Sequence, residues 1–299
     1  MRRSVNGILL LDKPEGLTSN GALQRVKRLF AAKKAGHTGS LDPIATGMLP
    51  ICFGEATKFS QFLLDSDKTY HVVAALGVRT TTGDTEGEVV ETLPIIDITA
   101  ERIAAMMTSF LGEIDQIPPM FSAIKVQGKA LYELARRGIE IERKSRRIKI
   151  FSLTLDGFNA DSFSFRVHCS KGTYVRSLVE DMGRALGCVA HVRVLRRELV
   201  MPYQNESMFS LPMLETIAES AGFAGLDACL LPIETAVKVF PAVQLSTSAA
   251  FYLRMGQAVR SSVPLNSTFV RLMSEDEKFL GMGEVMPDGR VKPDRLVSA

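Results

Sequence analysis

The segment that most constrains the fold of this chain is GHTGSLDPIATGMLP, residues 36–50, which is flanked by apolar residues. Its three glycines and two prolines exclude a regular helix or strand along the whole segment. Pro43 restricts the residue before it, Asp42, toward an extended conformation. We therefore expect a stiff, irregular loop that holds Asp42 in one position.

The residues leave two roles open for Asp42. It could cap a short helix whose first residue is Pro43, which is a favoured arrangement but leaves His37 and the glycines unexplained. It could instead be an ionised carboxylate in a pocket. That role needs a nearby cation, because burial raises a carboxyl pKa and an arginine lowers it. Arg176 falls in the first turn of an expected helix, where the helix dipole disfavours a cation, so we expect it to meet an anion.

Strand and helix patterns alternate along most of the chain without an internal repeat. Alternating apolar residues predict strands over 68–78 and 189–200. In the second of these, Val192, Val194 and Arg196 are predicted to share one face.

Helical spacing of apolar residues predicts a helix after the turn KPEG, with Ser19 or Asn20 as its N-cap. The same spacing predicts an amphipathic helix over 100–114. Together with the strands, these helices indicate a mixed α+β body.

Residues 243–299 have a different pattern. Short apolar runs in QAVRSSV, STFVRLMS, KFLGMGEVM and RVKPDRLV are separated by glycine, proline and acidic turns. This pattern predicts a small all-β module appended to the α+β body. We therefore expect two domains, covering residues 1–242 and 243–299.

The formal net charge of +3 hides separated basic and acidic regions. Basic residues gather in 1–36, 125–149 and 166–197, whereas acidic residues gather in 84–115. Basic stretches of this kind favour a polyanionic partner such as a nucleic acid. The apolar run after the basic start is too short for a signal peptide, and no stretch approaches the length of a membrane span. We therefore expect a cytoplasmic protein that does not associate with a membrane.

Several kinds of chemistry are excluded by missing motifs. The chain has no phosphate-binding loop, no complete dinucleotide fingerprint, no zinc deaminase signature and no nucleophile elbow. Its four cysteines are scattered without metal-ligand spacing, so we expect them to be small core residues. Neither a metal nor a cofactor is expected.

Five long segments occur in an order that resembles one known family. They are LDKPEGLTSN, GHTGSLDPIATGMLPICFGEATKF, DKTYHVVAALG, IPPMFSAIKVQGKALYELARRGIEIERKSR and CSKGTYVRSL. These segments resemble the TruB family of bacterial tRNA pseudouridine synthases, which isomerise uridine 55 in the T arm of tRNA. At the end of the chain, FLGMGE and GRVKPDRLV look like the PUA-type RNA-binding domain of that family.

The resemblance implies an α+β fold with a mixed, mainly antiparallel sheet, flanking helices and a small all-β PUA-like domain. It implies that the basic segment at about 117–147 is a thumb that clamps RNA. A thumb of this bacterial type argues for tRNA recognition without a guide RNA, and we expect a monomer.

The resemblance also implies roles for individual residues. Asp42 is expected to be the catalytic carboxylate. His37, Tyr70, Tyr174 and Leu195 are expected to bind the substrate. His37 contacts the tRNA and helps to displace the target base, Tyr70 stacks on the flipped uracil, Tyr174 lines the pocket, and Leu195 packs against the uracil. Supporting positions near the site are expected at Arg176, paired with Asp42, and at Lys13, Lys58 and Asp84.

Converting uridine to pseudouridine breaks the N1–C1′ bond, turns the uracil and forms a C5–C1′ bond, so no cofactor is needed. An ionised aspartate could attack C1′, attack the pyrimidine or take a proton from the sugar, and the sequence leaves all three open. Two other functions also remain open: a non-catalytic RNA-binding or tRNA-folding protein, and a guide-dependent pseudouridine synthase subunit. An ionised Asp42 argues against the first, because a pure binder needs no acid facing RNA phosphates.

Overall fold

The computed structural model describes residues 1–126, 128–262 and 267–298. Within them, the largest sheet has nine strands in the order β13-β1-β3-β12-β4-β11-β10-β7, with β2 paired to β3 beside this path. The strands are β1 (Gly7–Lys13), β2 (Ala35–His37), β3 (Thr46–Phe53), β4 (Lys68–Leu76), β7 (Gly112–Gln116), β10 (Arg146–Asn159), β11 (Ser162–Cys169), β12 (Ala190–Val200) and β13 (Phe209–Ser210).

The pairing of these strands is mixed and mainly antiparallel, which confirms the expected class of sheet. Only the pairs β1–β13 and β3–β12 run parallel, and the other pairs in the sheet are antiparallel. The parallel pair β3–β12 lies near the middle of the strand order, so β3 and β12 are covered by neighbours on both edges.

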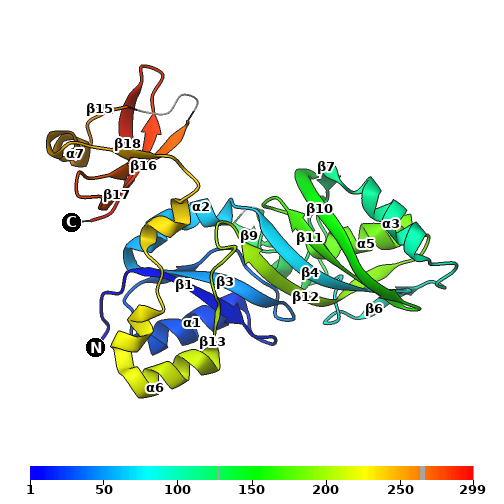
Figure 1. Cartoon of the computed structure of the whole chain (residues 1–299). Coiled ribbons are helices and arrows are strands. Elements are labelled where there is room, and N and C mark those ends of the chain that lie inside the picture. Colours follow the sequence, from blue (N-terminus) through cyan, green and yellow to red (C-terminus); the bar gives the residue numbers. More distant parts are fainter. Residues whose placement is uncertain (127, 263–266, 299) are drawn as a thin grey trace.

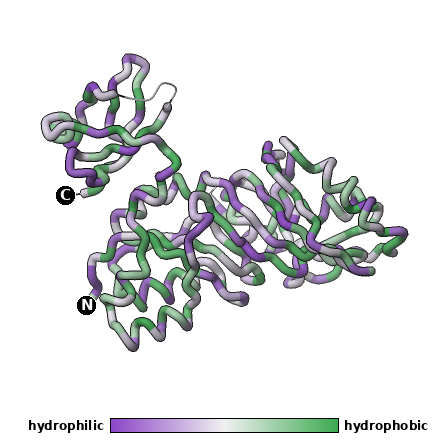
Figure 2. The backbone as a smooth tube through the Cα atoms, in the orientation of Figure 1, coloured by the Kyte–Doolittle hydropathy of each residue, from purple (hydrophilic) through white to green (hydrophobic). Residues whose placement is uncertain are grey.

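Helices gather at the two ends of this long sheet (Figure 1). Helices α1 (Ser19–Leu29) and α6 (Leu211–Ala228) lie at the β1 end, and α3 (Ala100–Ser109) and α5 (Val175–Ala185) lie at the β7 end. Apolar residues from all four helices join inward-facing strand residues in one core cluster. Hydrophobic stretches run along the strands of the sheet in Figure 2, as burial of that core requires. No helix among the described residues is long and apolar enough to cross a membrane.

Shorter elements complete the body. They are the 3₁₀ helices η1 (Gly54–Phe59) and η2 (Ile233–Val237), α2 (Ser60–Leu64), α4 (Leu131–Ala135), the hairpin strands β5 (Val78–Thr80) and β6 (Val89–Thr92), and β8 (Lys125–Val126) with β9 (Lys129–Ala130). The last two strands and α4 belong to the basic segment at 117–147.

A separate five-stranded sheet forms the C-terminal part of the molecule (Figure 1). Its elements are β14 (Ala242–Gln244), α7 (Thr247–Arg254), β15 (Val259–Arg260), β16 (Phe269–Met273), β17 (Phe279–Val285) and β18 (Arg290–Leu296). The sheet has its own apolar cluster, as an all-β module requires. Val263, at the end of one predicted strand, lies outside the described residues. The exact domain boundary at 242/243 stays a prediction.

Aromatic rings hold the C-terminal sheet against the body. Phe59 of η1 packs on Phe279 with ring centroids 5.4 Å apart. Phe62 of α2 packs edge-on against Phe240 and Phe269. These contacts form part of a second core cluster, which also contains residues from the outer face of β1 and β3.

Two helix predictions were wrong in detail. The helix predicted over 100–114 ends at Ser109, and Gly112, with φ +89°, begins β7. The helix after the KPEG turn is capped by Thr18, whose hydroxyl accepts a hydrogen bond from the Gly21 N–H, and not by Ser19 or Asn20.

The face predicted for the strand 189–200 was also wrong. A bulge between Val192 and Val194 shifts the pairing of β12 with β4, and 44% of Val194 is exposed as a result. Beyond the bulge, Leu195 and Arg197 are buried, whereas Arg196 forms an ion pair with Asp12. A bulge inserts one extra residue and so reverses the alternation after it.

Candidate active site

The loop between β2 and β3, residues 38–45, carries Asp42 and is called the Asp42 loop below. Gly39 (φ +80°) and Gly47 (φ +98°) flank its centre with backbone angles that favour glycine. A Cβ atom on Gly47 would lie 2.2 Å from the Arg197 carbonyl oxygen, so only glycine lets β3 approach β12 this closely. Gly36 has no such requirement, because it lies in β2 without a positive φ.

Two polar side chains fix the Asp42 loop from the α1 side. The hydroxyl of buried Ser19 accepts a hydrogen bond from the Leu41 N–H at 2.7 Å and donates to the Leu41 carbonyl at 3.0 Å. The ammonium of fully buried Lys13 donates to the Pro14, Leu17 and Pro43 carbonyls at 2.8, 2.6 and 3.3 Å. The residues on either side of Asp42 are therefore held by buried hydrogen bonds.

The Asp42 carboxylate is an ion-pair partner and not a helix cap. Residues 42–45 form a turn in which the Ala45 N–H donates to the Asp42 backbone carbonyl at 3.0 Å, and no helix starts at Pro43. The Oδ2 atom of Asp42 lies 2.9 Å from Nε of Arg176, and 38% of the Asp42 side chain is exposed. The carboxylate is thus paired on one side and open to an incoming molecule on the other.

Arg176 lies in the first turn of α5 with only 6% of its side chain exposed. Its two terminal nitrogens donate to the Thr82 carbonyl at 2.6 Å and to the Phe121 carbonyl at 2.7 Å. Asp84, which is also buried, places Oδ2 at 3.8 Å from the Arg176 Nε. These partners offset the unfavourable helix dipole and fix the guanidinium that Asp42 meets.

Burial raises the pKa of the Asp42 carboxyl above its ordinary value, and the Arg176 charge acts in the opposite direction. The Asp84 carboxylate adds to the increase, and the Lys13 ammonium opposes it. Burial lowers the pKa of Lys13 to about 8, although the Asp42 charge opposes that change. Two cations therefore oppose the effect of burial on the Asp42 carboxyl.

Tyr70 and His37 lie near a third cation, Arg197. Tyr70 is opposite Arg197 in the β4–β12 register and packs against the main core. Burial raises the pKa of the Tyr70 hydroxyl, whereas the nearby charge of Arg197 opposes that increase. Half-buried His37 ends β2, and both burial and the Arg197 charge lower the pKa of its imidazole.

Tyr174 and Leu195 occupy different environments. Tyr174 precedes α5, and its backbone N–H and carbonyl are both bound by the amide of buried Gln116, at 2.8 and 3.0 Å. Burial raises the pKa of the Tyr174 hydroxyl. Leu195 is 6% exposed, lies opposite Val72 in the β4–β12 register and belongs to the core cluster against which Tyr70 packs.

Lys58 does not meet Asp42 in any contact of the structure. Its ammonium binds the Glu55 carboxylate at 2.7 Å, the Leu296 carbonyl at 3.0 Å and the Ser298 hydroxyl at 3.0 Å. The Ser298 N–H also donates to Glu55, and these contacts lower the pKa of the Glu55 carboxyl to about 2. Lys58 therefore lies where the body meets the C-terminal sheet.

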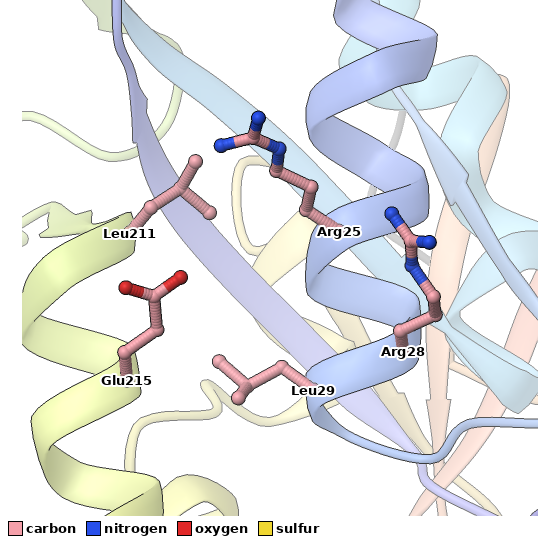
Figure 3. Close-up of a pocket in the computed structure, with 5 residues that line it drawn as sticks. All are labelled: Arg25, Arg28, Leu29, Leu211 and Glu215. Atoms are coloured by element: carbon pink, nitrogen blue, oxygen red, sulfur yellow. The ribbon is translucent and has the colours of Figure 1, made fainter.

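A surface hollow between α1 and α6 is separate from this site. Leu211 and Glu215 face Arg25 and Leu29 there, as Figure 3 shows. Among the described residues, no group of three or more His, Cys, Asp or Glu side chains is arranged to hold a metal ion.

Sequence reasoning missed three residues that shape the site: Ser19, Gln116 and Arg197. Ser19 was interpreted as a helix cap, and the bulge in β12 hid the inward direction of Arg197. The one available signal was the pair Arg196-Arg197 inside an apolar strand, since one of two adjacent strand residues must face inward.

Family models match the chain along most of its length. "TruB family pseudouridylate synthase (N terminal domain)" matches residues 27–175, "tRNA pseudouridylate synthase B C-terminal domain" matches 176–238, and "Pseudouridine synthase II TruB, C-terminal" matches 241–297.

Individual relatives agree with these matches. A tRNA pseudouridine synthase B of Coxiella burnetii is 54% identical over 296 residues, which cover 99% of this chain and 96% of that one. One of Vibrio parahaemolyticus is 52% identical over 302 residues, with the same coverage. A solved structure titled as a Cbf5-Nop10-Gar1 complex aligns with a TM-score of 0.77 at 26% identity, covering 97% of this chain and 84% of that one. Matched along nearly its whole length at such identity, the chain belongs to the TruB family of pseudouridylate synthases.

Proposed function

We propose that this protein converts one uridine of tRNA, uridine 55 in the T arm, to pseudouridine. It acts in the cytoplasm as a monomer, without a cofactor or a guide RNA. Relatives at 52–54% identity that carry the name tRNA pseudouridine synthase B support a tRNA substrate. The Cbf5 chain is similar at only 26% identity, which disfavours the guide-dependent alternative.

The observation that carries this proposal is the open ion pair of Asp42 and Arg176. One oxygen of this carboxylate lies 2.9 Å from a cation, and 38% of the Asp42 side chain is exposed. The exposed part is accessible to a bound substrate. A protein that merely binds RNA would gain nothing from an acid at such a point, because phosphates repel it. Asp42 is therefore the catalytic carboxylate of the proposed reaction.

The reaction balances without any added group. The N1–C1′ bond breaks, the uracil turns, and a C5–C1′ bond forms, while C5 loses a proton and N1 gains one. The uridine must leave the base stack first, and an aromatic ring beside the site supplies the face that replaces the stack. Tyr70 has this role, and His37 contacts the tRNA where the base has left.

The remaining residues support the pocket. Tyr174 and Leu195 line it, and Arg176 favours the ionised form of Asp42, with Asp84 as its second acidic partner. Lys13 fixes the Asp42 loop through its bond to the Pro43 carbonyl.

Two further regions are proposed to bind the rest of the tRNA. The basic segment at 117–147 is the thumb that closes on the T arm. Residues 243–299 form an RNA-binding domain of PUA type, and residues 1–242 form the catalytic domain.

The test is incubation of the purified protein with an unmodified tRNA transcript, followed by mapping of pseudouridine. We expect one pseudouridine, at position 55, with no guide RNA or cofactor added. A transcript with cytidine at 55 is the matched substrate control, and Asp42→Asn is the matched protein control, because it keeps shape and removes charge. Turnover by Asp42→Asn, or modification at another uridine only, would contradict the catalytic role or the position, respectively.

A further inference from the structure

A buried cation beside the site has no role in the chemistry proposed above. Arg197 lies on β12, and only 1% of it is exposed. Its guanidinium forms no ion pair with a carboxylate in the part of the chain that the structure describes. Removing a charge from water without such a partner is costly, so the hydrogen bonds of Arg197 must account for its place.

Two of these hydrogen bonds go to the two flanks of the Asp42 loop. Nε donates to the Met48 carbonyl at 2.7 Å, and a terminal nitrogen donates to the Gly39 carbonyl at 3.1 Å. Gly39 precedes Asp42 and Met48 follows it, so the guanidinium closes the loop across its base. The Arg197 backbone adds to this closure through its parallel pairing with Gly47.

Arg197 also lies directly opposite Tyr70 in the β4–β12 ladder, so the two side chains are cross-strand neighbours on one face of the sheet. Tyr70 and the Asp42 loop come from different segments of the chain, and Arg197 donates to the loop and is the strand partner of Tyr70. Among the described residues, the two cations beside Asp42 lack this combination: Arg176 bonds to Asp42 and to the Thr82 and Phe121 carbonyls, and Lys13 donates to backbone carbonyls.

We propose that Arg197 is a positioning residue, whose guanidinium holds the Tyr70 ring and the Asp42 loop in one fixed arrangement. The inference rests on the proposed function, in which the uracil lies between that ring and the Asp42 carboxylate. Because one rigid side chain holds the loop and the ring, the distance between the Tyr70 ring and the Asp42 carboxylate is set before the substrate binds.

Arginine is needed because the guanidinium is planar and carries five N–H donors in a fixed fork. A lysine ammonium at the same position is a point charge that cannot reach the Gly39 and Met48 carbonyls with the same fork of donors. Arg197→Lys therefore keeps the buried charge but releases part of the arrangement, and Arg197→Met removes the charge as well.

The experiment compares Arg197→Lys and Arg197→Met with wild type on the tRNA transcript, measuring single-turnover rate and tRNA affinity separately. We expect Arg197→Lys to slow the bound complex by at least about tenfold and Arg197→Met by about 10²-fold, since small misplacements of reacting groups cost this much. The tRNA dissociation constant is expected to stay within about threefold of wild type, because Arg197 is buried and meets no phosphate. A lost structural support alone would lower the folded fraction and leave the rate of the folded protein unchanged.

The matched control is Arg196→Lys, on the neighbouring residue of the same strand. Arg196 forms a half-buried ion pair with Asp12 and points away from the Asp42 loop, and lysine keeps its charge, so the replacement is expected to change neither rate nor affinity. A second readout does not depend on activity. In protein labelled at tyrosine Cζ, the Tyr70 resonance, assigned by Tyr70→Phe among the five tyrosines, should move in Arg197→Lys and stay in place in Arg196→Lys.

The outcomes separate this inference from the proposed function. If wild type makes no pseudouridine, the function fails, whatever the resonance does. If wild type is active and folded Arg197→Lys has the wild-type rate and an unmoved Tyr70 resonance, the positioning role is refuted. If both Arg197 variants fail to fold, as judged by circular dichroism, the residue serves stability alone and the inference also fails.

Discussion

Replacing Gly47 by alanine is expected to displace the Asp42 loop, although Gly47 is not among the residues proposed to contact the substrate. Gly47 is the second residue of β3, directly after the Asp42 loop, and it pairs with Arg197 of β12. A Cβ atom there would lie 2.2, 2.9 and 3.0 Å from the Arg197 backbone O, C and N atoms. All three are backbone atoms in a central strand, so no flexible side chain can move aside.

The cost has two parts. Forcing an L-residue to φ +98° costs about 1–2 kcal/mol. Separating β3 from β12 to admit the methyl group costs a further 1–3 kcal/mol, roughly, as overpacking usually does. The sum of about 2–5 kcal/mol is a large share of the usual 5–15 kcal/mol, roughly, of folding free energy.

The control is Gly187→Ala, because Gly187 also has a positive φ, +82°, but an added Cβ would meet nothing within 4 Å. It carries only the first part of the cost. Thermal unfolding followed by circular dichroism should show a clearly larger drop for Gly47→Ala, at about 2–4 °C per kcal/mol for a chain of this class. The single-turnover rate should fall only for Gly47→Ala, since only that change displaces the Asp42 loop. Equal melting points and equal rates for the two variants would refute the close-approach argument.

Three further predictions concern the proposed chemistry and RNA contacts. The rate of the bound complex should fall as the pH drops through the Asp42 pKa, which lies above its ordinary value. Arg176→Met removes the charge that lowers this pKa, so the fall in rate should move to higher pH; an unchanged pH profile would show that Arg176 does not act on Asp42. Tyr70→Leu should cost about 1–3 kcal/mol of stacking. Tyr70→Phe should keep the stacking and lose only the hydroxyl, so full activity of the Phe variant would show that the hydroxyl is dispensable. Replacing four basic residues of the thumb by alanine, Arg143, Lys144, Arg146 and Arg147, should weaken tRNA binding with little change in the rate of the bound complex. The slope of log affinity against log salt concentration should flatten by just under about one unit per lost phosphate contact, and an unchanged slope would refute the clamp.

Local patterns in the sequence predicted the class of the fold and the importance of one loop. The α+β body, the all-β C-terminal module and a meeting of Arg176 with an anion follow from spacing, turn residues and the cost of an unpaired charge, whereas the mixed sheet was implied by the family resemblance. What failed was every detail that depends on pairing between distant strands. The bulge in β12 is invisible in the sequence, and it turned Arg197 inward where alternation predicted Arg196.

Ser19 illustrates the same limit at the level of one hydroxyl. A serine near a helix start is normally interpreted as a cap, because its oxygen can accept from the first free N–H groups. Thr18 has taken that role, and the Ser19 hydroxyl exchanges two hydrogen bonds with Leu41 across the start of the Asp42 loop. The sequence does not show which of two adjacent hydroxyls caps the helix and which points toward the Asp42 loop, because that depends on how the helix packs in the fold.

Strand β3 gives Lys58 a role that fits its contacts. The strand begins at the Asp42 loop and is paired with β1, β2 and β12, so it is held on both edges. It ends at Phe53 and continues directly into η1, whose Glu55 and Lys58 bind the last described residues of the C-terminal sheet. The position of that sheet relative to Asp42 is therefore set by one buried, fully paired strand. We propose that a tRNA bound to both regions meets them at a fixed separation, and that Lys58 supports the site by holding the C-terminal sheet in place.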